Sequence, residues 1–355
     1  MFGEMKKIQY MIIAAVILTV LTACEKVSPI GVLVSGTGVE DRVKMSHLYY
    51  LEHKGDTRAH DASQLDEYTF LVGADSHLTT NDDRMREMLQ IAMDNNDLLI
   101  AHLGDIADTK AEYYITLEDL VDEYRWKYAK MHYQELFVGD PNDSDELDDP
   151  SLYYYADTIY NVLYNVESVP YPFYPVVGNH DITHNGWALW SNIFHSSFYD
   201  VYVLVNVTDA ETVFDHFIFL DSASGTLGEE QVRLIEEGIF EERQYTEFGI
   251  SVRNTFVFSH TNIFRPRSVE FASTFPREEM FFLLDKFDEW NANIVFLGHV
   301  HKWDYQKVGK TEYLTLDSMG EGTNPGPGDY LIRVHVKKDG TIWWEKVHMS
   351  SIPGK

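Results

Sequence analysis

Short apolar runs recur along this chain from residue 68 onward, and each one stops at a group of Asp, Asn or His residues. The runs are rich in β-branched and aromatic side chains and have the length of buried strands, so they predict strands with polar residues at their carboxyl ends. The second run, at residues 98–108, reads LLIAHLGDIAD. The others end in VGADSH, VVGNHD, FVFSH and VFLGHVH. We expect all of these groups to lie along one rim of a sheet.

Segments with helical spacing separate several of these runs. Residues 82–95 carry Met85, Met88, Leu89, Ala92 and Met93 at intervals that place them on one helix face. Two more helices are predicted, one after FIFLD with Val232, Ile235 and Ile239 on one face, and one over residues 278–290. Strand, helix and strand in this order favour an α/β fold with parallel strands. The chain ends in a predicted β-meander with a hairpin turn at Asp339-Gly340.

Residues 109–175 interrupt this regular pattern as a predicted helical insertion. Helical patterns cover residues 117–137 and 153–163, and the acidic loop GDPNDSDELDDP lies between them. The loop lacks the glycine and the terminal glutamate of a calcium-binding loop, so a solvated loop is the better interpretation. We expect the insertion to form a lid or wall over the site.

The amino terminus has the pattern of a secretory signal. Lys6 and Lys7 precede an apolar run over residues 11–21, which is too short to span a bilayer comfortably, and Leu21-Thr22-Ala23-Cys24 follows. This resembles the lipobox of bacterial lipoproteins, which implies that residues 1–23 are removed and that Cys24 is lipidated. The expected location is then extracytoplasmic, with a lipid anchor in a bacterial membrane. An ordinary signal peptide or an uncleaved anchor is the alternative.

Residues 24–66 are predicted to be a tether with possible edge strands, and residues 67–355 a single large domain. A chain of 355 residues with 45% hydrophobic residues can bury a core of that size. Its only cysteine lies at the predicted cleavage site, which leaves no disulfide. The formal net charge of -29, with no basic cluster to offset it, excludes nucleic acid as an expected partner.

The polar groups at the strand ends are suited to metal binding. Asp, Asn and His offer the oxygen and nitrogen donors that borderline divalent ions accept, and Mn, Fe and Zn all remain possible. One carboxylate can bridge two ions, which then bind both the nucleophile and the leaving oxygen of a phosphoryl displacement. Asp105 is the candidate bridge, because a carboxylate at a buried strand end is costly unless it is paired or metal-bound.

Taken in order, DSH, GDIAD, GNHD, the single His260 and GHVH resemble the motifs of the calcineurin-like metallophosphoesterases. The resemblance implies a four-layer α/β/β/α sandwich of the metallo-dependent phosphatase type with a helical insertion. It also implies a dinuclear centre whose bridging hydroxide attacks phosphorus. One ion would be held by Asp75, His77, Asp105 and His301, and the other by Asp105, Asn179, His260 and His299. His180 would act on the leaving oxygen, oriented by Asp108, and Asp181 would support the ligands.

Departures from related patterns narrow the expected activity. Purple acid phosphatases have tyrosine where Asp108 stands and glycine where His77 stands, so a tyrosinate-iron site is disfavoured. Protein Ser/Thr phosphatases have arginine where Thr109 stands, so a small phosphorylated substrate, either a monoester or a diester, is expected instead. The alternative function is a non-catalytic binding or interaction protein on the same scaffold. A nuclease is disfavoured by the acidic charge.

Several other polar or aromatic residues are given no catalytic role. His102, His216 and His348 are interpreted as core or surface residues. His184 and Trp187 could equally face a substrate or take part in ordinary packing. Asp221, at the end of FIFLD, resembles a structural position of the family.

Overall fold

Two β-sheets form the centre of the protein. The computed structural model describes residues 38–52, 59–77, 83–106, 172–182, 186–208, 211–240, 250–264, 275–319 and 330–350. The five-stranded sheet has the order β12 (Ile342–His348), β11 (Tyr330–Lys337), β2 (Glu67–Gly73), β3 (Leu99–His102) and β4 (Phe173–Pro175). The seven-stranded sheet has the order β1 (Ala59–Asp61), β5 (Tyr199–Val207), β6 (Thr212–Leu220), β7 (Ile250–Ser259), β8 (Ala292–Leu297), β10 (Thr311–Thr315) and β9 (Asp304–Val308).

Parallel strands lie at the centre of both sheets. β2, β3 and β4 are parallel, and so are β6, β7, β8 and β10. The predicted closing meander is wrong in one respect, because its two hairpins belong to different sheets. β9 pairs with β10 in the seven-stranded sheet, whereas β11 pairs with β12 and β2 in the five-stranded sheet. The predicted Asp339-Gly340 turn does connect β11 and β12, and Gly340 has the positive φ of 87° that such a turn requires.

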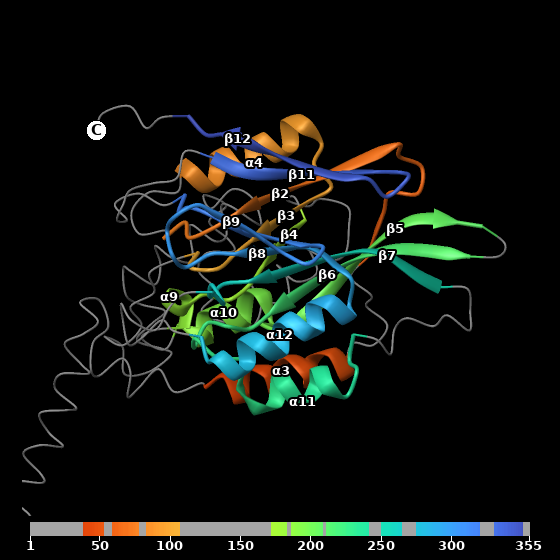
Figure 1. Cartoon of the computed structure of the whole chain (residues 1–355). Helices are drawn as coiled ribbons and strands as arrows, with labels where there is room; N and C mark the ends of the chain where they lie inside the picture. The colour runs from red at the N-terminus through yellow and green to blue at the C-terminus, as the bar shows by residue number, and fades with distance from the viewer. Residues whose placement is uncertain are drawn as a thin grey trace, which may run out of the picture.

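Helices cover the outer faces of the two sheets (Figure 1). α4 (Asp83–Asn95) lies over the five-stranded sheet, and α9 (Asn179–Ile182) and α10 (Trp187–Phe194) follow β4. α3 (Val39–Glu52), α11 (Gly228–Glu236) and α12 (Arg277–Glu289) lie under the seven-stranded sheet. The helices predicted over 82–95 and 278–290 are therefore confirmed to within a residue or two. The four-layer α/β/β/α order is also confirmed.

The largest core lies between the two sheets. Phe70 of β2 points into it, and its ring centroid lies 5.0 Å from those of Phe217 and Phe256 in the opposite sheet, with near-perpendicular ring planes. Phe258 and Phe296 complete this aromatic cluster, and all five rings are fully buried. Full burial of one such side chain stabilises the fold by roughly 1.5–3 kcal/mol. This packing holds the two sheets face to face, with their parallel strands ending at a common rim.

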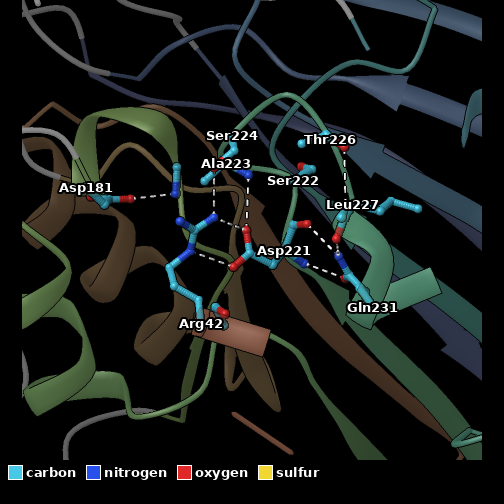
Figure 2. Close-up of polar contacts among 12 residues, drawn as sticks. Arg42, Asp181, Asp221, Ser222, Ala223, Ser224, Thr226, Leu227 and Gln231 are labelled. Carbon is cyan, nitrogen blue, oxygen red and sulfur yellow. Dashed lines mark hydrogen bonds and ion pairs between the residues drawn. The ribbon is translucent and has the colours of Figure 1, made fainter. Parts of the chain in front are cut away.

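The predicted tether over residues 24–66 is wrong for the helix α3, which is an integral part of the domain. Arg42 of α3 is completely buried and forms a bidentate ion pair with Asp221, with both nitrogen–oxygen distances at 2.8 Å (Figure 2). The Asp221 backbone N–H and carbonyl are in turn bound by the side chain of Gln231 in α11. Asp221 therefore has the structural role that was expected. Sequence spacing could not reveal its partner, because Arg42 lies 179 positions away.

Some predictions concern residues that lie outside the described part of the chain. These are the signal peptide over 1–23, Cys24, Asp108, His184 and nearly all of the insertion over 109–175. Among the described residues, the structure contains no helix that combines the length and the apolarity needed to cross a membrane.

Candidate metal centre

The predicted donors lie at the carboxyl ends of parallel strands, but they come from two sheets rather than one. Asp75, Asp105 and Asn179 follow β2, β3 and β4 of the five-stranded sheet. His260 follows β7, and the GHVH segment follows β8 of the seven-stranded sheet. The expectation of a single sheet rim is therefore corrected: the rim is shared by the two facing sheets.

The first donor group consists of Asp75, His77, Asp105 and His301. Each offers one ligand atom, and these atoms all lie within 4.8 Å of one another. The Nε2 atoms of His77 and His301 are 3.1 Å apart, and His301 Nε2 lies 3.3 Å from Asp75 Oδ1. Two imidazole nitrogens and two carboxylates directed at one point match the donor set that borderline divalent cations accept.

The second donor group consists of Asp105, His260 and His299, whose ligand atoms also lie within 4.8 Å of one another. His260 Nε2 lies 3.4 Å from Asp105 Oδ2 and 3.2 Å from His299 Nδ1. The carbonyl oxygen of the Asn179 side chain is 2.9 Å from the same His260 nitrogen. Asp105 thus belongs to both groups, as a carboxylate bridging two ions must.

The described backbone fixes which nitrogen of His260 faces the donors. Its Nδ1 lies 2.7 Å from the carbonyl oxygen of Leu103. Because a carbonyl can only accept, Nδ1 carries a proton, and Nε2 is the nitrogen that faces Asp105 and Asn179 and becomes a ligand when it releases its own proton to make way for a metal ion. A ligand imidazole oriented by a carbonyl in this way is typical of metal sites. The donor chemistry therefore fits a pair of divalent cations.

Tight turns after the strands aim the donors into the rim. Asp75, His77, Asp105, His299 and His301 all have positive φ values, between 45° and 68°. Side chains other than glycine adopt this left-handed region rarely, although Asp, Asn and His tolerate it better than most. Five such residues in one site represent backbone strain that the surrounding fold maintains, a pattern that clusters at functional sites.

Side chains beyond the donor groups fix the loops that carry them. Buried Asp181 accepts hydrogen bonds from the backbone N–H of Ile106 at 2.9 Å and of Gly178 at 2.8 Å, and so joins the loops after β3 and β4. Ser318, which the sequence interpretation did not single out, donates to the backbone carbonyl of Asp75 at 2.7 Å. Asp181 therefore has the supporting role expected of it.

Burial and mutual charge shift the pKa values of the donors in opposite directions. Burial by itself raises the pKa of the Asp105 carboxyl, but the charges of His260 and His180 outweigh it and hold that pKa well below its usual range. Burial lowers the pKa of His260, yet the negative charge of Asp105 and its hydrogen bond raise it to about 9. The Asp75 pKa is also lowered, because hydrogen bonding and charge from His301 and His260 outweigh its burial. The carboxylates are therefore ionised at neutral pH, as ligation requires.

His180 lies beside both donor groups without belonging to either. Its backbone N–H donates to Asp105 Oδ1 at 2.7 Å, and its ring meets that of His77 edge-on with centroids 4.7 Å apart. The side chain is only partly buried. His180 is therefore positioned next to the donors and can be reached by a substrate. Its expected partner, Asp108, lies outside the described residues.

His102, His216, His348 and Trp187 belong to neither donor group. His216 pairs with Asp200 at 2.9 Å in the core, and His348 is exposed on β12. His102 is fully buried, and its two ring nitrogens have no hydrogen-bond partner in the described structure. Trp187 is 3% exposed and packs in the same core cluster as Met85 and Met88 of α4. For Trp187, ordinary packing is thus the better interpretation.

No protein-family model matches the chain, and no curated protein does. Among solved structures, GAP50, the anchor in the inner membrane complex of Plasmodium, aligns over 81% of this chain and 90% of its own length, with 10% identity and a TM-score of 0.41. A dimetal phosphatase from Danio rerio aligns over 80% and 99%, with 11% identity and a TM-score of 0.39. A predicted phosphoesterase from Streptococcus pneumoniae TIGR4 aligns over 80% and 98%, with 12% identity and a TM-score of 0.27.

Similarity at this level does not define an activity, which has to be inferred from the geometry of the site. The order of layers and the two donor groups at the shared rim are those that the resemblance to calcineurin-like metallophosphoesterases implied.

Proposed function

We propose that this protein is a hydrolase of phosphoester bonds that depends on two divalent metal ions. The observation that carries the proposal is the pair of donor groups that share Asp105. A buried carboxylate common to two sets of buried or partly buried histidines has no evident purpose in packing, since burying such charges without ions is costly. Two ions held so close together are suited to phosphoryl displacement.

Each ion has its own set of proposed ligands. One ion would be held by Asp75, His77, Asp105 and His301. The other would be held by Asp105, Asn179, His260 and His299. When bound, such ions would polarise the phosphoryl oxygens as Lewis acids and lower the pKa of a coordinated water. The chain's own contribution is to keep the carboxylates ionised, to fix the tautomer of His260 and to hold the strained loops. Mn, Fe and Zn are all compatible with this donor set.

His180 is the proposed catalytic residue of the protein itself. Its partly buried ring lies beside His77 and its backbone is tied to Asp105, so it can donate a proton to the leaving oxygen or stabilise the phosphoryl group. Asp108 is proposed to orient the His180 ring. Residue types and spacing support that role, since GDIAD places Asp108 three positions after the proposed bridging ligand.

The substrate is proposed to be small and phosphorylated, and the protein to be exported. A net charge of -29 repels polyanions, which disfavours nucleic acid. Lipidation of Cys24 would anchor the chain to a membrane on its extracytoplasmic side, and the LTAC sequence at residues 21–24 supports this. The loops around the rim would determine whether a monoester or a diester is bound.

Hydrolysis by the full-length chain in mild detergent tests the proposal. With manganese added, we expect turnover of p-nitrophenyl phosphate, of its bis-aryl diester, or of both, and loss of turnover with a chelator. His180→Ala should lower kcat by about a hundredfold to ten-thousandfold. Its bound metal, measured by elemental analysis, should stay at the wild-type level.

The matched control is His348→Ala, which removes an exposed imidazole on β12 and should leave kcat unchanged. An inert wild-type protein that still binds two ions would overturn catalysis and favour the non-catalytic scaffold. A protein that binds no divalent ion would overturn the metal centre itself.

A further inference from the structure

An exposed lysine whose ammonium lies against two aromatic rings is found at the edge of the sandwich. The Lys346 ammonium of β12 lies 3.8 Å from the ring centroid of Trp303 and 3.9 Å from that of Tyr330. Trp344, on the same face of β12, contacts Trp303 with ring centroids 5.7 Å apart, and its indole N–H donates to Glu312. The rings are therefore held in place, and the ammonium is fixed by two cation–π contacts.

Lys346 lies toward the same rim as the metal centre. Trp303 is two residues after the proposed ligand His301. Tyr330 begins β11, and Ile332, two residues later, is in register with Val72 of β2, which lies just before the turn to Asp75. Asp317 is close enough to act on the charge of Lys346, and the next residue, Ser318, binds the Asp75 carbonyl. Segments that touch Lys346 thus continue directly into the donor loops.

The cation has no anion bound to it within the described structure. Its ammonium makes no hydrogen bond or ion pair there, and the two ring faces are its contacts. Partial burial lowers the pKa of Lys346, and the charge of Asp317 offsets this only in part. In contrast, Lys307 on the neighbouring β9 is neutralised by Glu312 at 3.4 Å. An exposed ammonium that lies against two ring faces and has no acidic partner among the described residues, in a strongly acidic protein, is suited to binding an anionic group.

We propose that Lys346, with Trp303 and Tyr330, forms a binding subsite for a second anionic group of the substrate. This inference rests on the proposed function, in which the first phosphoryl group lies at the metal centre. The substrate class is then a phosphoester that carries a further carboxylate or phosphate at some distance from the scissile group. The rings exclude water on two sides of the ammonium, so that a charge-assisted hydrogen bond forms on the third.

Matched phosphonates test this subsite by equilibrium binding rather than by turnover. Phosphonohexanoate and hexylphosphonate share one phosphonate and differ in a terminal carboxylate; phosphonodecanoate and decylphosphonate extend the reach. On the manganese-loaded full-length protein, calorimetry should show that at least one carboxylated ligand binds about tenfold more tightly than its partner. Lys346→Met should abolish this preference, and Lys346→Arg should retain it. Tryptophan fluorescence should change with the carboxylated ligand only, because Trp303 lies against the subsite.

Lys307→Met is the control, since it removes one positive charge from the same edge of the protein and leaves Lys346 and its two aromatic rings in place. Its preference should equal that of the wild type. If both members of each pair bind equally to the wild type, the subsite is overturned while the metal centre stands. If neither member binds at all, the proposed function fails, and the subsite fails with it. A preference lost equally in Lys307→Met would show general electrostatics and overturn the subsite.

Discussion

Gly178 lies against Asp105 so closely that any side chain there would overlap the backbone nitrogen and the Oδ1 of Asp105. Gly178 precedes Asn179, another proposed ligand, so the loop after β4 and the loop after β3 depend on each other. We predict that Gly178→Ala displaces Asp105 and weakens manganese binding by about tenfold to a hundredfold. Titration calorimetry on the purified protein measures this.

The control for Gly178→Ala is Gly38→Ala, because a Cβ at Gly38 meets nothing within 4 Å. That variant should bind manganese as the wild type does. Unchanged affinity in Gly178→Ala would show that Asp105 is not held by this contact, or that it is not a ligand.

His102 is a buried imidazole whose nitrogens have no hydrogen-bond partner within the described structure. Burial lowers its pKa to about 3. Because the unfolded chain takes up this proton near pH 6.5, stability falls as the pH drops from about 6.5 toward 3, by about 2 kcal/mol at pH 5. We predict that His102→Leu removes this part of the acid sensitivity and raises the free energy of unfolding by about 1 kcal/mol even at pH 8.

Urea unfolding at about pH 5 and about pH 8 measures the effect of His102→Leu. The variant should gain more stability at the lower pH. His348→Leu, at an exposed position of β12, serves as the control and should leave the pH dependence unchanged. Equal gains at both pH values would contradict the assigned pKa.

The ion pair between Arg42 and Asp221 attaches α3 to the domain, and both side chains have no exposed surface. Arg42→Met leaves a buried carboxylate without its cation, which should cost about 3–5 kcal/mol of unfolding free energy. Thermal or urea unfolding checks this. Arg233→Met, in an exposed pair on α11, should change stability little. A small effect at Arg42 would mean that α3 is only loosely attached.

Lipidation at Cys24 makes a separate prediction about the amino terminus. In a bacterial host, the full-length chain should incorporate a radiolabelled or alkyne-tagged fatty acid and partition with membranes. Cys24→Ala should lose the label. A labelled Cys24→Ala protein, or an unlabelled wild type, would favour an ordinary signal peptide or an uncleaved anchor.

The sequence was informative about the site because its signals are local. A strand that ends in Asp or His is visible in a few consecutive residues, and the seven predicted metal-binding residues do lie together at one rim. The supporting roles were less accessible. Ser318 binds a carbonyl 243 positions away, and nothing in its neighbourhood distinguishes it from any other serine.

The amino-terminal helix shows the opposite case. The pattern over residues 39–52 is weakly amphipathic, and one of its buried residues is Arg42, a residue type that is rarely found in the core. Only the distant Asp221 makes that burial possible. The division of the last four strands between two sheets has a similar origin. β10 pairs with β8 and β11 pairs with β2, and these partners are distant or out of order in the sequence.

The chain's linear order of apolar and polar residues determined the strands, most of the helices and the kind of ligand atoms at the strand ends, since these follow from local propensity and periodicity. Only the tertiary structure decided that two sheets share the donors, that Asp105 belongs to both groups and that Lys346 lies between aromatic rings. These relationships depend on side chains far apart in the chain, and they form only when the packing of the Phe70 cluster brings the two sheets face to face.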